Sequence, residues 1–116
     1  IFPIGGIFVY YARVVQYKLG IGQRDIAEKL TKEFDKKSRK LVGFRGSVYF
    51  FDDPSGEYRA LSYWDTKEEA EQAHKKLFPE LEAKLLGVTR EKPIVKFYEV
   101  FEATDDEDLM ASHIKI

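Results

Sequence analysis

The sequence contains no cysteine, and this absence removes several kinds of chemistry at once. Disulfide bonds, thiolate nucleophiles and cysteine-based zinc sites are all excluded. Only two histidines are present, His74 and His113, which argues against a histidine-rich metal site. We therefore expect no bound metal.

Asparagine is also absent, and glutamine occurs only three times, whereas lysine and glutamate together supply 25 residues. Low amide content with abundant Lys and Glu is typical of proteins from thermophiles. A thermophilic source is one interpretation of this composition, and compositional drift in a short chain is the other.

Long apolar runs are missing too. None approaches the roughly 18–20 residues that a membrane-spanning helix requires, so we expect no membrane partner. The 19 Lys and Arg residues nearly balance the 20 Asp and Glu residues, which argues against nucleic-acid binding, because phosphate neutralisation needs a basic excess. The first residues resemble no secretory signal, and we expect a cytoplasmic protein.

The chain has 116 residues, of which 44% are hydrophobic, and this suits one domain with a packed core. Periodicity and turn signals divide it into four strands and two helices. We predict a single domain over residues 7–103, a lead-in at 1–6 and a C-terminal tail at 104–116. The predicted strands are 8–17, 42–51, 57–64 and 94–102, and the predicted helices are 23–41 and 65–87, with Pro79 allowing a break in the second helix.

The order βαββαβ predicts an α+β fold of the ferredoxin-like type, with a four-stranded antiparallel sheet and both helices on one face. The strands are nevertheless apolar on both sides. In the second strand the alternation places Phe44, Val48 and Phe50 on one side, and Tyr49 and Phe51 on the other. An uncovered apolar face of this size is unusual for a monomer. We therefore expect a homodimer that packs sheet against sheet.

The C-terminal tail has a mixed character. Its acidic run at 105–108 favours disorder, but four of the last eight residues are apolar: Leu109, Met110, Ile114 and Ile116. We expect this tail to dock on the dimer, with the segment 114–116 pairing with a sheet edge.

Short motifs follow one another along the chain at a recognisable spacing. They are Tyr11-Ala12-Arg13-Val14, Gly22-Gln23-Arg24-Asp25-Ile26, Gly43-Phe44-Arg45-Gly46-Ser47, Tyr63-Trp64 with Thr66-Lys67-Glu68-Glu69-Ala70, His74, and Val95-Lys96-Phe97-Tyr98-Glu99-Val100. In this order they resemble the antibiotic biosynthesis monooxygenase domain, a branch of the dimeric α/β barrel superfamily. The resemblance covers about residues 7–103 and implies that two such chains form an α/β barrel.

This family includes cofactor-free oxygenases of aromatic polyketides, haem-degrading oxygenases and quinol oxygenases. The first two groups rely on an Asn together with a Trp. Trp64 matches that Trp, but Ala60 stands where the polyketide oxygenases carry their Asn, and Ala12 or Arg13 stands where the haem degraders carry theirs. We therefore expect no bound cofactor and no productive haem binding.

Two aromatic side chains are candidates for a catalytic role. Trp64 ends a strand just before a helix, where its indole forms either the floor of an aromatic-ligand pocket or part of the core. His74 lies on the apolar face of its helix, where it is either a general base or haem ligand, or a hydrogen-bonded structural residue.

Polar residues interrupt otherwise apolar strands. Arg13 and Arg45 need partners if they lie inside the molecule, and Glu57 and Glu99 are the candidates. They either bind an anionic or carbonyl group in a pocket, or lie at edges in water. Ser47 has the same two interpretations.

Tyr49 is a further pocket candidate, although aromatic residues at strand spacing are more often core. Ser62 is another, because small residues at 60, 62, 70 and 73 leave volume beside Trp64 and His74, where we expect a cavity.

Two functions remain open. One is a cofactor-independent monooxygenase that acts on a small aromatic or quinone-like compound. The other is a dimeric, non-enzymatic module that binds a small apolar or aromatic ligand.

Overall fold

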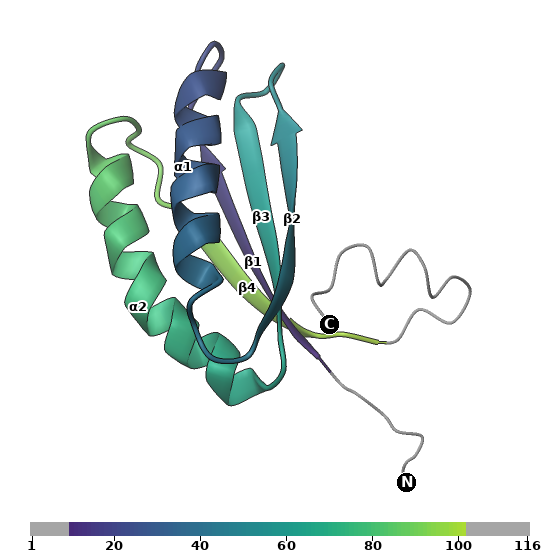
Figure 1. Cartoon of the computed structure of the whole chain (residues 1–116). Coiled ribbons are helices and arrows are strands. Elements are labelled where there is room, and N and C mark those ends of the chain that lie inside the picture. The colour runs from purple at the N-terminus through teal and green to yellow at the C-terminus, as the bar shows by residue number, and fades with distance from the viewer. Residues whose placement is uncertain (1–9, 102–116) are drawn as a thin grey trace, which may run out of the picture.

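The computed structural model of the chain describes residues 10–101 (Figure 1). The predicted lead-in and tail, with the expected docking of the tail, lie outside these residues. Four strands and two helices alternate in the predicted order βαββαβ, which confirms the ferredoxin-like α+β fold. The elements are β1 (Tyr11–Lys18), α1 (Arg24–Ser38), β2 (Phe44–Asp52), β3 (Glu57–Trp64), α2 (Lys67–Leu86) and β4 (Ile94–Glu99).

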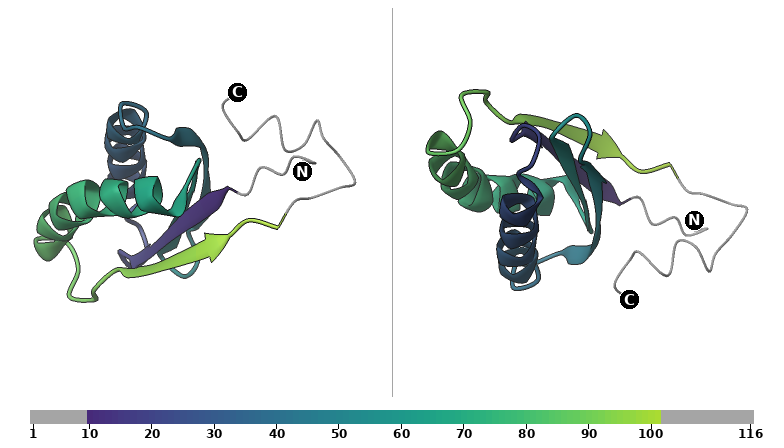
Figure 2. Two further views of the ribbon diagram at one scale, coloured as in Figure 1. Left: turned by 90° about the horizontal axis from the view of Figure 1, so that it is seen from below. Right: turned by 90° about the horizontal axis from the view of Figure 1, so that it is seen from above.

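The four strands form one antiparallel sheet in the order β2-β3-β1-β4, so β3 and β1 are central and β2 and β4 are edges. Both helices cover one face of this sheet and leave the other face uncovered (Figures 1 and 2). No helix of the described part of the chain is long and apolar enough to cross a membrane.

Helix α2 runs without interruption through Pro79, where the sequence allowed a break. Its start is capped by Thr66, whose Oγ1 accepts a hydrogen bond from the backbone N–H of Glu69 at 3.1 Å. Leu77 and Leu81 are buried on either side of Pro79, whereas Pro79 itself is exposed. The buried leucines hold both halves of the helix on the core, which explains why the proline does not end it.

A bulge in β2 changes which side chains face the helices. The register places Phe44 opposite Trp64 but Gly46 opposite Tyr63, so one extra residue is inserted between them. Phe44 is therefore buried among the helix-facing side chains, and its expected place beside Val48 and Phe50 is wrong. Simple alternation could not predict this, because the bulge reverses the sides within the strand.

The helix-facing side of the sheet is organised in rows that cross the strands. One row joins Arg13 on β1, Ser62 on β3 and Ser47 on β2. The next row toward Tyr17 joins Val15, Ala60 and Tyr49. Apolar rows flank these two: Tyr11, Trp64 and Phe44 on one side, and Tyr17, Tyr58 and Phe51 on the other.

The uncovered face carries apolar side chains near its middle and at its edges. Val14 and Leu61 on the central strands are half-buried. Phe50, Ile94 and Tyr98 on the edge strands are about half exposed, at 51%, 52% and 49%. Such a cluster of large apolar side chains on one flat face is characteristic of an interaction surface.

Candidate functional site

A small cavity of about 50 Å³ lies between the sheet and the two helices. Its sheet side includes Ala60 and Ser62, whose short side chains leave room beneath the helices. Side chains from both helices, including Phe34 and Leu81, complete the wall. A cavity of about 150 Å³ holds benzene in another protein, so this one takes a few water molecules and must widen to hold an aromatic ring.

Arg13 lines this cavity and is only 7% exposed. Its Nε donates a hydrogen bond to Nδ1 of His74 on α2 at 3.2 Å. Neither expected partner, Glu57 or Glu99, is bonded to it, and within residues 10–101 no carboxylate lies within ion-pair distance of it. Burial lowers the pKa of Arg13 to about 10, so its guanidinium stays charged at neutral pH.

His74 is half-buried and holds the guanidinium of Arg13 in place. Its ring packs against Phe78 at 4.7 Å and against Phe97 at 5.3 Å between centroids. Burial and the positive charge of Arg13 lower the pKa of His74, with a small opposing effect from Glu82. The imidazole is therefore neutral at neutral pH, as a hydrogen-bond acceptor must be.

The hydrogen bond between Arg13 and His74 also determines whether His74 could ligate haem. Haem is considered because the family that the sequence resembles includes haem-degrading oxygenases. Because Nδ1 of His74 accepts from Arg13, the neutral ring carries its proton on Nε2. Neither ring nitrogen then has a free lone pair to offer to iron. The residues present do not fit haem ligation by His74.

Trp64 is completely buried, and its Nε1–H donates to Oγ of Ser62 at 2.9 Å. The ring packs edge-on against Phe44, with 5.4 Å between centroids, and lies in a core cluster that also contains Ala70 and Ala73. These two alanines allow α2 to approach the indole closely.

The cavity therefore does not lie where the sequence placed it. We expected Trp64 and His74 to border it, and neither residue lines it. Each contacts a residue that does: Trp64 bonds to Ser62, and His74 bonds to Arg13. The indole of Trp64 fills the space beside the small residues at 70 and 73. The open volume therefore lies farther along the sheet, over Ala60 and Ser62.

A second polar cluster joins α1 to β2. Both Ser47 Oγ and Tyr49 Oη donate to Oδ1 of Asp35, at 2.6 and 2.7 Å. Nε of Arg39 donates to Oδ2 of Asp35 at 2.7 Å. Burial alone would raise the pKa of Asp35, but hydrogen bonds from Ser47, Arg39 and Tyr49 outweigh it and hold that pKa below its ordinary value.

Tyr49 belongs both to this cluster and to the cavity wall. Burial and the nearby carboxylate of Asp35 raise the pKa of Tyr49 well above its ordinary value. Its phenol therefore stays protonated at all ordinary pH values and acts as a hydrogen-bond donor.

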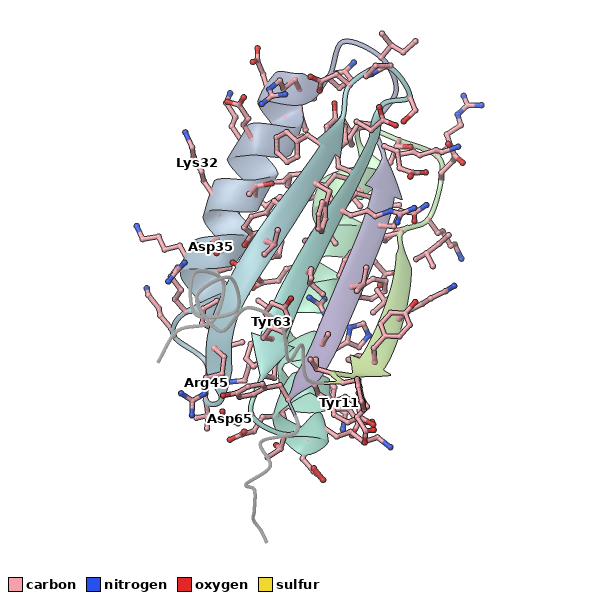
Figure 3. The ribbon with its side chains drawn as sticks, turned by 90° about the vertical axis from the view of Figure 1, so that its right-hand side faces the viewer. Tyr11, Lys32, Asp35, Arg45, Tyr63 and Asp65 are labelled. Carbon is pink, nitrogen blue, oxygen red and sulfur yellow. The ribbon has the colours of Figure 1, made fainter. Side chains whose placement is uncertain are left out.

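Arg45 lies apart from the cavity, at the end of the sheet near Asp65 (Figure 3). Its Nε donates to Oδ1 of Asp65 in a half-exposed ion pair. Of the predicted pocket residues, Arg13, Tyr49 and Ser62 line one cavity. Trp64 and His74 do not line it but are hydrogen-bonded to residues that do, and Arg45 lies apart from it.

Sequence reasoning missed Asp35 and the helix side of the cavity. Thr31, Asp35 and Ser38 follow one another at helical spacing on the flank of α1 that faces β2, and Thr31 and Ser38 line the cavity. This polar stripe beside the apolar face was the available signal. Within residues 10–101, no three His, Asp or Glu side chains converge on a possible metal position.

Comparison with known proteins rests on structure alone. No family model matches the sequence, and no curated protein matches it significantly. Several solved structures do match over most of their length, at TM-scores of 0.63 to 0.69.

Three of these structures illustrate the similarity. NE2512, a protein of unknown function from Nitrosomonas europaea, superimposes with a TM-score of 0.69 at 16% identity, covering 85% of this chain and 96% of its own. A monooxygenase from the gene ActVA-Orf6 of Streptomyces coelicolor, solved in complex with nanaomycin D, gives 0.68 at 16% identity, covering 85% and 94%. A second Nitrosomonas europaea protein, described as a candidate antibiotic biosynthesis monooxygenase, gives 0.69 at 10% identity, covering 87% and 99%. At such identities the similarity shows the fold.

Proposed function

We propose that this chain, whose fold is that of antibiotic biosynthesis monooxygenase domains, is a cofactor-independent monooxygenase for a small aromatic or quinone-like compound. The observation that carries the proposal is the charged Arg13 in the wall of a cavity, with no carboxylate partner in the described part of the chain. The fold similarity to a monooxygenase solved in complex with nanaomycin D supports a small-molecule ligand.

The chemistry needs no electron carrier if the substrate itself supplies the electrons. A ring CH₂ group that ionises to an enolate reacts with O₂ and becomes a carbonyl, while the second oxygen atom leaves as water. The substrate loses two electron pairs and O₂ accepts them. The atoms balance as R₂CH₂ + O₂ → R₂CO + H₂O. Arg13 stabilises the enolate oxygen, since a positive charge acts strongly in a site that excludes water.

The remaining candidates support this arrangement. His74 positions the guanidinium through Nδ1, and Trp64 orients the hydroxyl of Ser62 through its indole N–H. Tyr49 lines the cavity wall with its ring, and its oxygen can accept a hydrogen bond there while its proton is donated to Asp35. Arg13, Tyr49 and Ser62 are therefore the proposed ligand contacts, with His74 and Trp64 as positioning residues.

A second copy of the chain is the proposed cover for the bare sheet face. Phe50, Ile94 and Tyr98 are about half exposed there, and a shallow groove lies over Val14 and Leu61. Burying about 800 Å² per partner would meet the usual size of a specific interface. Light scattering at micromolar concentration should give the mass of a dimer, and Leu61→Arg should give a monomer; a monomeric wild type would overturn this assembly.

Oxygen uptake tests the proposed reaction. The protein is incubated with an anthrone, which carries the ring CH₂ group that the proposed reaction oxidises, and uptake is followed beside an Arg13→Met variant. We expect uptake that the substitution reduces at least tenfold, while Arg90→Met, which removes an exposed charge outside the cavity, has no effect. Ligand binding without uptake would overturn the monooxygenase and favour the non-enzymatic binding module.

A further inference from the structure

We propose that His74 is a proton-controlled gate between the small cavity at Arg13 and the open groove beside Phe97. The neutral ring keeps the gate closed, and the imidazolium opens it. This inference rests on the proposed use of the cavity as the binding site, and it goes further, because it assigns the route into the cavity and the group that controls it.

The first step is that His74 stands between two spaces. Arg13 lines the cavity of about 50 Å³, and its hydrogen-bonded partner His74 lines a surface groove of about 340 Å³ together with Phe97. The two spaces have no lining residue in common. The pair Arg13–His74 is therefore where the cavity meets the groove, and a ligand too large for the cavity needs this pair to separate.

The second step is that one hydrogen bond holds the pair together. Nε of Arg13 donates to Nδ1 of His74 at 3.2 Å, and within residues 10–101 this is the one side-chain hydrogen bond of His74. The imidazole otherwise packs on the rings of Phe78 and Phe97. Such ring contacts stabilise the imidazole, but the hydrogen bond is what directs Nδ1 toward Arg13.

The third step is that a proton removes this bond. Nδ1 accepts a hydrogen bond only in the neutral ring, because both nitrogens of an imidazolium are donors. Protonation would also place two positive charges side by side. Arg13 is 7% exposed and cannot carry its charge into water, whereas His74 is half-buried and borders the groove. His74 is therefore the side chain that would move.

The fourth step is the charge that the imidazolium meets on the groove side. Charged groups around His74 come from three elements: Arg13 on β1, Glu99 on the same side of β4 as Phe97, and Glu68, Glu71, Lys75 and Glu82 on α2. In the closed arrangement burial and Arg13 lower the pKa of His74, and Glu82 opposes them. Glu68 and Glu71 line the groove without an ion-pair partner in the described part of the chain. An imidazolium that leaves Arg13 therefore turns toward carboxylates, and protonation and opening favour each other.

The test uses Trp64, the only tryptophan of the chain, whose Nε1–H is bonded to Ser62 in the cavity wall. Quenching of its fluorescence by acrylamide, a neutral probe, is measured from about pH 8 to about pH 5, where a histidine titrates. We expect the quenching constant to rise about threefold or more as pH falls, because a pKa that differs by one unit between the closed and open forms changes the open population tenfold. The midpoint should coincide with the pKa of His74 measured by NMR of its ring nitrogens.

Two substitutions of His74 should give opposite results. His74→Gln keeps an acceptor for Arg13 but takes up no proton, so quenching should stay low at every pH. His74→Ala removes the ring, so quenching should stay high at every pH. His113→Gln changes the other histidine of the chain and should follow the wild type.

Circular dichroism at each pH shows whether the variants are folded. If His74→Ala is not folded, the wild type and His74→Gln decide. The gate would be overturned by quenching of the wild type that does not change with pH, by a midpoint away from the pKa of His74, or by a His74→Gln variant that follows the wild type. A folded His74→Ala variant that is as well protected as the neutral wild type would also overturn it.

The assay contains neither substrate nor a requirement for oxygen, so it separates this inference from the proposed reaction. Quenching that follows the titration of His74, without oxygen uptake in the earlier assay, would leave the gate standing and overturn the oxidation. Oxygen uptake together with quenching that is independent of pH would overturn the gate and leave the oxidation standing.

Discussion

Two charged side chains lie between the helices and the sheet, and their surroundings are opposite. Asp35 on α1 accepts three hydrogen bonds, from Ser47, Tyr49 and Arg39, and one of these donors carries the compensating charge. Arg13 on β1 is more deeply buried, at 7% exposure, and its one side-chain partner within residues 10–101 is the neutral His74. The less buried charge is fully matched, and the more buried charge is not.

This difference separates a structural role from a binding role. A saturated carboxylate that joins a helix to an edge strand stabilises the fold, because each of its donors would otherwise be left without an acceptor. A buried charge without a counter-ion contributes little to stability and is often replaceable by an apolar side chain. Arg13 is therefore best explained by what it binds, and Asp35 by what it holds together.

The largest expected effect is the loss of the Asp35 carboxylate. Asp35→Ala should lower the free energy of unfolding by about 2–3 kcal/mol, because hydrogen bonds to a charged group are lost and their donors are stranded. Urea denaturation measures the change. Glu33→Ala is the matched control on the same helix and should cost much less, since the partners of Glu33 in the described part of the chain are Lys37 and Lys84, in half-exposed ion pairs. Equal losses in the two variants would contradict the structural role of Asp35.

A smaller loss of stability is expected when the hydroxyl of Tyr49, which donates to Asp35, is removed. Tyr49→Phe removes one hydrogen bond and keeps the ring, so it should lower the free energy of unfolding by about 1 kcal/mol. Tyr63→Phe on the uncovered face is the matched control, and we expect no comparable loss there (Figure 3). A Tyr49→Phe variant as stable as the wild type would show that this bond contributes nothing.

The smallest expected difference between the surroundings of Arg13 and Asp35 is in the pH dependence of stability. The folded pKa of His74 lies below the ordinary value of 6.5, so the unfolded chain binds the proton more readily. Its contribution to stability is complete above about pH 6.5 and is lost as pH falls through the folded pKa. His74→Gln should flatten the stability profile in this window only, and an unchanged slope would contradict the neutral acceptor role.

Asp35 follows the same sign in a more acidic window. Its folded pKa lies below the ordinary value of 3.8, so its stabilising effect is present above that value and is lost as pH falls further. Thermal unfolding of Asp35→Ala should therefore lose its difference from the wild type only in strong acid. A difference that already disappears near neutral pH would place the effect elsewhere.

Much of the fold follows from local pattern. Alternation, turn residues and helical spacing are local properties, and they predict β3 at Glu57–Trp64 and the order of all six elements. The side of Phe44 could not be predicted in this way, because one bulged residue before Gly46 reverses the alternation. The continuous α2 likewise depends on leucines that pack on the distant β1, and not on Pro79 alone.

The candidate site shows the same limit more strongly. A polar residue within an apolar strand pointed to Arg13, because a polar side chain in a core requires a reason, whereas Ser62 was indicated by the small residues around it. Which partner each residue finds depends on register and on helix placement. Arg13 meets His74, 61 residues away, and not Glu57 or Glu99. Asp35 on α1 becomes important only once β2 brings Ser47 and Tyr49 beside it.

The stability of Arg13→Met tests the central claim most directly. If Arg13 serves to bind a ligand, the free energy of unfolding of the Arg13→Met variant, measured in urea, should stay within about 1 kcal/mol of the wild-type value or rise. This is the behaviour of other buried charges replaced by apolar residues. If Arg13 instead holds the fold together, the same substitution should cost about 3 kcal/mol or more, as when a buried pair is broken. That larger loss would contradict the account.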